Sequence, residues 1–227
     1  MPIPGNSKAE RRISAKERIF ETVKDWIMEG QLAPGEKILD ATIAEYFQVS
    51  RTPVREAIQL LEQQKLVVSY PGKTTLVTEL DTDHIEQWYA PMQVLHQLGI
   101  TLAVDRIEEK DMDSLRQIHL GLKEGIQKKE SIFYTLKQNK KFYDEILLVA
   151  RNTYLVDFCN TLWTHILRLE QNVLNQYDIL EEFAQDQEQL LEALERKDQF
   201  SAGMLMKNHW DRAVIQIRNL IAGTKEE

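Results

Sequence analysis

The stretch QVSRTPVREAIQLLEQQKLV, residues 48–67, decides how the first third of this chain folds. Thr52 and Pro53 form a helix start signal, because proline is favoured in the first helical turn and threonine is a competent N-cap. We expect a helix from Pro53 to about Gln64. Its apolar positions recur at i, i+3, i+4 and i+7, namely Val54, Ala57, Ile58 and Leu61. One helix face should therefore join a core while the other stays free.

Arg51 and Arg55 stand four residues apart where this helix begins. Like charges at this spacing repel, and cations at a helix N-terminus oppose the macrodipole by roughly 0.3–1 kcal/mol. The arrangement is locally unfavourable without an anion. One interpretation is a solvated face on which Glu56 or Glu62 offsets Arg55; the other is a polyanion that lies across the helix start.

The flanking residues predict a winged helix. Ser14 should cap a first helix that stops at Gly30, and a short helix at 40–47 is joined by a tight link to the opening helix, which makes a helix-turn-helix. The β-branched runs LVVSY and TTLVT follow, separated by residues 71–73, and predict a hairpin.

From Asp81 onward the apolar pattern is helical throughout. We expect six helices, near 83–108, 111–129, 131–151, 153–174, 177–197 and 199–222. The predicted fold class is mainly α, with an N-terminal winged helix-turn-helix domain, its small β-hairpin wing, and a C-terminal all-α bundle. The expected division is a flexible arm at 1–13, the winged helix at 14–78, a linker at 79–83, the bundle at 84–222 and a tail at 223–227.

Charge is distributed unevenly between these parts. The net charge is −8, but residues 1–78 carry 11 Lys and Arg against 10 Asp and Glu, and the remainder carries 17 against 26. The acidity therefore belongs to the second part and does not exclude nucleic-acid binding by the first. Cys159 is the lone cysteine, and no run of 18 apolar residues or N-terminal apolar segment occurs. We expect a cytoplasmic protein without a disulfide framework or a membrane partner.

The segments VSRTPVREAI, LLEQQKLV and PGKTTLV resemble the N-terminal domain of GntR-family bacterial transcription regulators. The helical remainder resembles the ligand-sensing domain, called FCD, of the FadR-like branch of that family. Together the resemblance covers residues 14–222. It implies a recognition helix in the major groove of DNA and a wing on the neighbouring minor groove or backbone.

The resemblance implies a set of DNA-binding residues, namely Ser50, Arg51, Thr52, Arg55, Gln59, Gly72 and Lys73. The two arginines would read guanine edges, Ser50 and Thr52 would hold phosphates, and the last two residues would form the wing tip. Arginine can donate to guanine O6 and N7 together, which is worth about 1–3 kcal/mol of discrimination. The chain departs from many relatives at Ala41, where they carry a DNA-contacting arginine.

In metal-binding FCD relatives, an aspartate, a histidine four residues later and two further histidines hold the ion. The matching positions here are Asn139, Tyr143 and Gln187, and His209 alone is retained. Amide oxygens are weak ligands, and tyrosine would have to lose a proton of pKa about 10. We therefore expect no metal and no other cofactor.

The same positions still lie on apolar stripes, so three helices should each point a polar group inward. Arg168 matches a basic residue that relatives place near the effector, and His165 stands where another arginine often occurs in them. The predicted effector set is Asn139, Tyr143, His165, Arg168, Gln187 and His209, which would suit a small carboxylate or phosphate. The alternative is that these are ordinary buried polar groups bonded to one another, or that Arg168 pairs with Glu170 or Glu192.

The function expected from these features is a ligand-responsive repressor that binds a palindromic operator as a homodimer and has no enzymatic activity. A di-iron enzyme would need repeated Glu-x-x-His pairs, and the sequence contains none. The alternative function is a DNA-binding dimer whose degenerate C-terminal pocket serves dimerisation alone. His84, His96 and His119 should be structural or exposed. The first bundle helix carries four large apolar residues that could form core or dimer surface: Trp88, Leu95, Leu98 and Leu102. We expect all four to form core.

Overall fold

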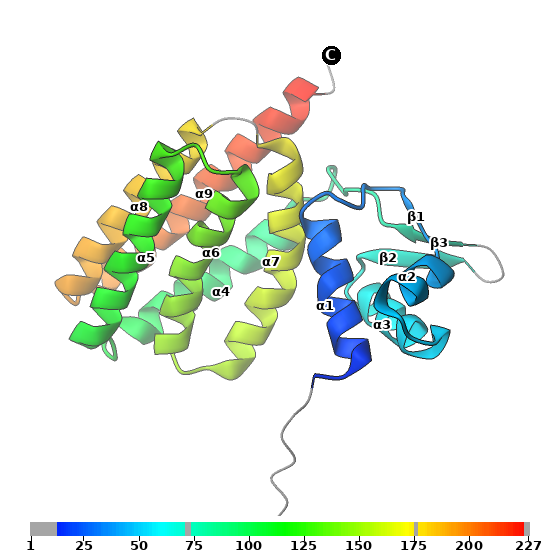
Figure 1. Ribbon diagram of the computed structural model, residues 1–227. Coiled ribbons are helices and arrows are strands. Elements are labelled where there is room, and N and C mark those ends of the chain that lie inside the picture. The colour runs from blue at the N-terminus through cyan, green and yellow to red at the C-terminus, as the bar shows by residue number, and fades with distance from the viewer. Residues whose placement is uncertain (1–12, 71–73, 175–176, 225–227) are drawn as a thin grey trace, which may run out of the picture. The chain divides into compact units, whose positions relative to one another are not determined.

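The computed structural model describes residues 13–70, 74–174 and 177–224 (Figure 1). Most of the predicted N-terminal arm, the wing tip and the last three residues lie outside these ranges. The chain divides into two compact units between Glu79 and Leu80.

The N-terminal unit is a winged helix-turn-helix, as predicted. Its elements are α1 (Ala15–Met28), β1 (Lys37–Ile38), α2 (Asp40–Phe47), α3 (Arg51–Gln63), β2 (Val67–Tyr70) and β3 (Thr74–Val77). The strands form an antiparallel sheet in the order β1-β3-β2, in which Val67 faces Val77 and Tyr70 faces Thr74. The short strand β1 is an addition to the predicted hairpin, and its two residues are too few to show a periodicity.

The core of this unit lies between α1 and α3, which pack against each other. Ile19, Val23 and Ile27 of α1 are buried with Val54 and Leu61 of α3. Ser14 caps α1 as expected. Its hydroxyl oxygen accepts from the backbone N–H of Glu17 at 3.1 Å, and the Glu17 carboxylate accepts from the Ser14 N–H at 2.9 Å, which completes a capping box.

Helix α3 begins earlier than the sequence predicted. Its N-cap is Ser50 rather than Thr52, so Arg51 and Thr52 belong to the first turn and Pro53 is its third residue. Proline is tolerated there because the first four backbone N–H groups of a helix have no partner within it. Both arginines therefore lie on the helix itself.

The described part of the C-terminal unit consists of six helices, at the predicted places. They are α4 (Glu86–Val104), α5 (Glu109–Gln127), α6 (Ile132–Val149), α7 (Thr153–Val173), α8 (Asp178–Glu195) and α9 (Gln199–Thr224). Helix α4 packs against α9, α7 and α6, while α5 packs against α6 and α8 (Figure 1). The bundle core is consequently shared by all six helices.

The expectation that Trp88, Leu95, Leu98 and Leu102 form core is wrong. Leu98 is exposed and the other three are only half-buried. The buried face of α4 is formed instead by Tyr89, Met92, His96, Gly99, Ile100, Ala103 and Val104. Because α4 is apolar around most of its circumference, its apolar periodicity does not show which side faces the core. Of the other histidines, His119 is buried and His84 is exposed.

Candidate functional site

The predicted DNA-binding residues that the structure describes share one exposed surface. They are Ser50, Arg51, Thr52, Arg55 and Gln59, and all are exposed at or near the start of α3. The opposite face of α3 is buried. Gly72 and Lys73 lie outside the described residues. Helix α3 therefore presents a polar, doubly cationic N-terminal half to solvent.

Arg55 forms an ion pair that the sequence did not suggest. Its Nε lies 3.1 Å from Oδ2 of Asp40, in the first turn of α2, rather than next to Glu56 or Glu62. Glu62 instead accepts from the backbone N–H of Ser69 at 2.9 Å. An exposed ion pair is worth about 0–1 kcal/mol, so Arg55 can exchange Asp40 for another acceptor at little cost.

The C-terminal unit holds a buried hydrogen-bonded chain that begins at Tyr143. The Tyr143 hydroxyl lies 3.0 Å from Nε2 of His209, and Nδ1 of His209 lies 2.7 Å from Oδ2 of Asp186. Because a carboxylate only accepts, His209 donates from Nδ1; in the neutral ring, Nε2 then accepts from the Tyr143 hydroxyl. Arg212 donates to the other oxygen of Asp186. Burial alone would raise the pKa of Asp186, but the bonds from His209 and Arg212 hold it below its usual value.

A second buried chain runs through the amide side chains. Gln187 Nε2 donates to Oδ1 of Asn139 at 2.9 Å, and Oε1 of Gln187 lies 3.2 Å from Nδ1 of His119. Burial lowers the pKa of His119, so the ring is neutral at neutral pH and donates from Nδ1. Sequence reasoning missed both Asp186 and His119, because neither belongs to a recognisable spacing.

The ring of His96 lies among the aromatic rings of Tyr143, Trp163 and Trp210 in the bundle core. The ring of His96 lies 5.3 Å from that of Tyr143, 5.8 Å from Trp163 and 5.2 Å from Trp210. Trp210 Nε1 donates to His96 Nδ1 at 3.2 Å, so the proton of His96 is on Nε2. Burial and then nearby His209 lower the pKa of His96 to about 3. Among the described residues, neither His96 Nε2 nor Trp163 Nε1 has a hydrogen-bond partner.

Glu170 lies on the same stripe of α7 as Trp163, seven residues further on. Its Oε1 accepts from the Tyr89 hydroxyl at 2.9 Å, and its Oε2 has no partner within the described ranges. Burial raises the pKa of Glu170 to about 8, so this carboxyl group is mostly protonated at neutral pH.

Comparison with known proteins decides the family. The family described as "Bacterial regulatory proteins, gntR family" matches residues 15–77, and the FCD domain matches residues 89–212. The chain belongs to the GntR family. It carries the FCD domain of the FadR-like branch, as the sequence predicted.

Similar proteins are named as transcriptional regulators. The Escherichia coli regulator McbR is 24% identical over 86% of this chain and 89% of its own length. The Haemophilus influenzae Uxu operon regulator is 26% identical over 89% of this chain and 82% of its own length. The match to the Bacillus subtilis regulator YdhC, 26% identical, covers 61% of this chain and 62% of that protein. The solved structure of E. coli McbR/YncC has the same fold, with a TM-score of 0.79 at 19% identity over 92% of this chain and 99% of that one. No helix in the described part of this GntR-family chain is long and apolar enough to cross a membrane.

The bundle of this regulator groups four of the six predicted effector residues. Tyr143 is bonded to His209 and Asn139 to Gln187, and all four are buried. The other two lie elsewhere on α7. His165 stacks on Trp88 with ring centroids 5.3 Å apart, and Arg168 lies five residues after Trp163, which places it about 140° around the helix.

Glu170 and Glu192, the two acids that the sequence offered as partners of Arg168, contact other residues. Glu170 accepts from Tyr89, and Glu192 accepts from Arg196 at 3.0 Å.

The metal found in some FCD relatives does not suit the residues present here. Both ring nitrogens of His209 are occupied by Tyr143 and Asp186, and the oxygens of Asn139 and Gln187 accept from neighbouring side chains. Within the described ranges, no group of three or more His, Cys, Asp or Glu residues is placed to hold a metal ion. This donor set therefore lacks the free lone pairs that a transition metal needs.

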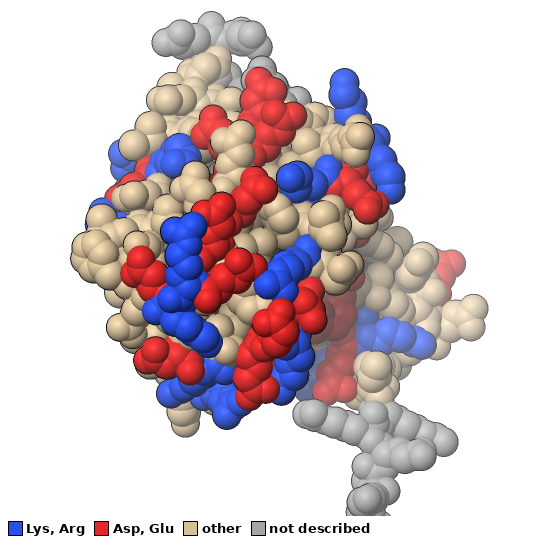
Figure 2. Space-filling model, turned by 90° about the vertical axis from the view of Figure 1, so that its left-hand side faces the viewer, with Lys and Arg blue, Asp and Glu red and all other residues tan. Residues whose placement is uncertain are grey.

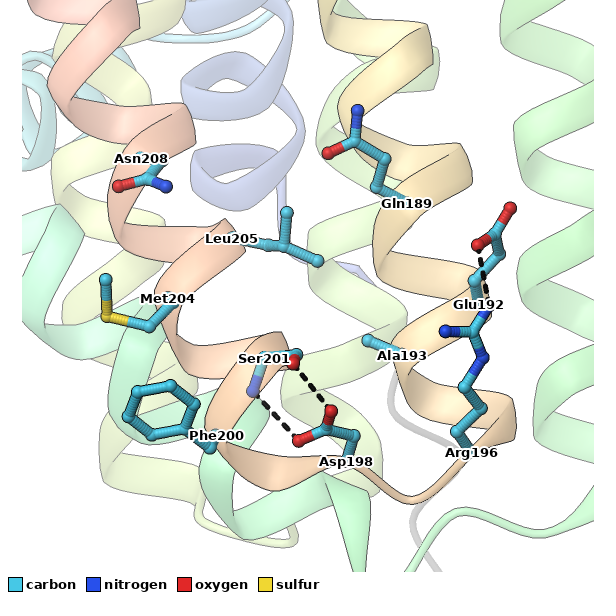
Figure 3. A pocket seen from close by; sticks show the side chains of 10 residues that line it. All are labelled: Gln189, Glu192, Ala193, Arg196, Asp198, Phe200, Ser201, Met204, Leu205 and Asn208. Carbon is cyan, nitrogen blue, oxygen red and sulfur yellow. Dashed lines mark hydrogen bonds and ion pairs between the residues drawn. The ribbon is translucent and has the colours of Figure 1, made fainter.

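Three described cavities open on the surface of the bundle, and none is lined by these four buried residues. A groove of about 370 Å³ lies between the end of α8 and the start of α9 (Figure 3), one of about 520 Å³ lies between α5 and α8, and one of about 100 Å³ lies between α4 and α9. In the first groove, polar contacts are made within the chain, since Asp198 accepts from the Ser201 N–H at 3.0 Å and Glu192 pairs with Arg196.

Proposed function

We propose that this regulator binds a palindromic operator as a homodimer, represses transcription and reads bases with Arg51 and Arg55. The observation that carries this proposal is the exposed N-terminal half of α3, where both arginines project from the side opposite the core. The N-terminal residues of a recognition helix are those that reach base edges in the major groove. The relatives are named as transcriptional regulators, so we propose no catalytic activity.

DNA also removes the electrostatic cost of this helix start. Arg51 and Arg55 repel each other and oppose the helix dipole, and half-buried Asp40 offsets only one of them. A guanine edge or a phosphate group supplies the missing acceptor to both. Ser50 and Thr52 can donate hydroxyl groups to the backbone, which positions the helix without selecting a sequence.

Mobility-shift titration on the natural operator and on unrelated DNA of equal length tests the recognition role. Arg51→Ala and Arg55→Ala should each lose about 1–3 kcal/mol of operator affinity, while affinity for unrelated DNA falls much less. Asp40→Asn is the matched control, because it breaks the ion pair and leaves Arg55 in place. Unchanged operator preference in both arginine variants would disprove the assignment.

We also propose that the bundle senses a small organic anion, a carboxylate or a phosphate. Support comes from the membership of the FCD family and from two buried donors without partners, His96 Nε2–H and Trp163 Nε1–H. An unpaired buried donor costs about 1–3 kcal/mol, and an oxygen acceptor that reaches both rings removes that cost. Of the predicted effector residues, Tyr143 lies beside both rings and His209 lies beside Tyr143, while Arg168 and His165 are on another face of α7.

A thermal-shift screen of carboxylate and phosphate metabolites tests this half of the proposal, since a ligand of the folded state raises the melting temperature. Trp163→Phe keeps most of the ring and removes the donor, so it should lose the response. Trp88→Phe, a half-buried tryptophan on α4, is the control and should keep it.

The second candidate function is a bundle that dimerises and senses nothing. The closed pairs Asn139–Gln187 and Tyr143–His209 favour it, because they satisfy groups that an effector would otherwise bind. The two candidates differ in one measurable property. A sensing regulator changes its operator affinity with the ligand found in the screen, whereas a purely dimerising bundle does not respond to any compound.

A further inference from the structure

The smallest of the three described cavities, about 100 Å³, opens between the first half of α4 and the second half of α9, and we call it the α4/α9 mouth. Tyr89 and Trp210 are buried, each only 2% exposed, and form its floor. The side chains of Glu86 and Arg218 are about half exposed and lie at its rim. The mouth therefore leads from the surface of the bundle to its aromatic core.

The two rings of the floor bond to buried groups that still have unpaired atoms. The Tyr89 hydroxyl donates to Oε1 of Glu170, whose Oε2 has no partner in the described part of the chain. Trp210 Nε1 donates to Nδ1 of His96, and Nε2 of His96 is likewise unpaired among the described residues. The ring centroids of Tyr89 and Trp210 are 5.8 Å apart. The aromatic floor therefore separates the α4/α9 mouth from the polar groups that the proposed effector would meet.

Polar contacts between α4 and α9 close the rim of the mouth. Arg218 Nη2 pairs with Oε1 of Glu86. Gln93 Nε2 donates to Oδ1 of Asp211, which also pairs with Lys207. Because an exposed ion pair is worth about 0–1 kcal/mol, Arg218 can exchange Glu86 for another anion at little cost. A guanidinium group can donate two parallel hydrogen bonds to a carboxylate or a phosphate, so it suits either group.

The first turn of α4, which carries Glu86, is held weakly by the helix itself. Pro91 lies inside α4, and proline has no N–H to donate to the carbonyl four residues earlier, that of Gln87. The N-cap residue Ile85 makes no side-chain cap bond. This turn therefore depends on contacts with neighbouring helices, and the Glu86–Arg218 pair is one of them.

The two larger cavities do not lead to the unpaired groups. Neither the groove between α8 and α9 nor the groove between α5 and α8 is lined by Tyr89 or Trp210. The α5/α8 groove lies on the side of the bundle that is crowded with charges of both signs (Figure 2). Its lining places Glu181 and Glu188 against Lys123. An anion that approaches this groove meets two carboxylates for one ammonium group, whereas each carboxylate at the α4/α9 mouth is paired with its own cation.

We propose that the anionic effector enters the bundle through the α4/α9 mouth, and that Arg218 receives its carboxylate or phosphate group in place of Glu86. This inference rests on the proposed sensing function and names the entrance and the cation that serve it. Ligand pockets usually measure about 300–1,000 Å³, so a mouth of this size takes only the anionic end of a metabolite. Displacement of Glu86 also releases the first turn of α4, which carries Tyr89 of the floor.

Quenching of tryptophan fluorescence by iodide, a small anion, tests the entrance on the full-length chain. The parent protein for this test carries Trp26→Phe and Trp88→Phe, which remove the two half-buried tryptophans. The signal then comes from Trp163 and Trp210, which are buried, and Trp210 lies in the floor of the mouth. Quenching by acrylamide, which is neutral, measures access without the influence of charge.

The two rim variants should change iodide quenching in opposite directions. Glu86→Gln should raise the iodide quenching constant by about two- to fivefold, the factor that corresponds to loss of the exposed pair, because Arg218 then lacks its internal anion. Arg218→Gln should lower the constant, because Glu86 then repels the entering iodide. Acrylamide quenching should change much less in both variants.

Another exposed pair supplies matched controls. Glu192→Gln and Arg196→Gln make the same changes of charge near the end of α8, and neither residue lines the α4/α9 mouth. Both should leave iodide quenching at the parent value. Circular dichroism should show all variants folded, since the substituted rim and control side chains are about half exposed or more.

Iodide quenching that stays at the parent value in Glu86→Gln or in Arg218→Gln would overturn the inference, and so would an equal rise with acrylamide. The sensing function is judged separately by the thermal-shift screen. A metabolite response that Arg218→Gln leaves unchanged would reject this entrance and keep the proposed function. Opposite iodide shifts in a bundle that responds to no metabolite would support the anion entrance and reject the sensing function.

Discussion

Substitution of Glu170 by glutamine tests whether the buried carboxyl group makes the bundle sensitive to pH. Burial raises the pKa of Glu170 from 4.5 to about 8, and the Tyr89 hydroxyl donates to it. Glutamine has nearly the same shape, keeps an oxygen to accept from Tyr89 and cannot ionise. The wild type and the variant therefore differ only in whether the side chain at position 170 can ionise.

The sign follows from proton linkage. A group whose pKa is higher in the folded state than in the unfolded state stabilises the fold at pH values below its unfolded-state pKa. This stability is lost as the pH rises through the folded-state pKa. For Glu170 the loss runs from pH 4.5 to about 8, at up to 1.36 kcal/mol per pH unit. Between pH 6 and 8 the free energy of unfolding should fall by about 2 kcal/mol. His96, whose pKa is about 3 in the fold, acts in the opposite direction and mostly below this window.

Urea unfolding at several values from pH 6 to pH 8, followed by tryptophan fluorescence, measures this difference. Trp163 and Trp210 are buried beside the site and report on the bundle. The free energy difference between wild type and Glu170→Gln should change by about 2 kcal/mol across the window, with the variant favoured at pH 8. Glu181→Gln, at an exposed acid on α8, should follow the wild type. Parallel curves for wild type and Glu170→Gln would refute the reasoning.

Two further predictions concern the chain that begins at Tyr143. Tyr143→Phe should lower the free energy of unfolding by about 1–3 kcal/mol, because it leaves His209 Nε2 buried without its donor; the urea midpoint measures this. Zinc, nickel or manganese at modest excess should not raise the melting temperature, since both nitrogens of His209 are already bonded. A rise of several degrees that a chelator reverses would contradict this second prediction.

The N-terminal unit could be predicted almost completely because its signals are local. The cap at Ser14 and the link at residues 48–49 are each read from a few neighbouring residues. The helix start at Ser50 was missed by two residues, because proline is acceptable at several positions of a first turn. The partner of Arg55 was missed because Asp40 lies fifteen residues away on another helix.

In the bundle, periodicity predicted which side chains point inward but not what they meet. Asn139, Tyr143, Gln187 and His209 are all buried as their stripes indicated. Their partners lie 48 residues apart in one pair and 66 in the other, and no local pattern specifies which polar groups of two distant helices lie side by side. Two partners, Asp186 and His119, were therefore absent from the predicted set.

Three of the buried groups that stay unpaired after these bonds are formed belong to side chains of α4 and α7. His96 Nε2 and Trp163 Nε1 are donors, and Oε2 of Glu170 is a third site without a partner in the described chain. Because the pKa of Glu170 is about 8, its carboxyl group is protonated at neutral pH, and Oε2 can then donate as well. Below pH 8 all three of these groups can therefore donate, and an oxygen acceptor that reached them would pair them. Above that pH the ionised carboxylate would repel an anion. Under the proposed sensing role, one buried acid would thus link the stability of the bundle to the class of effector that it can accept.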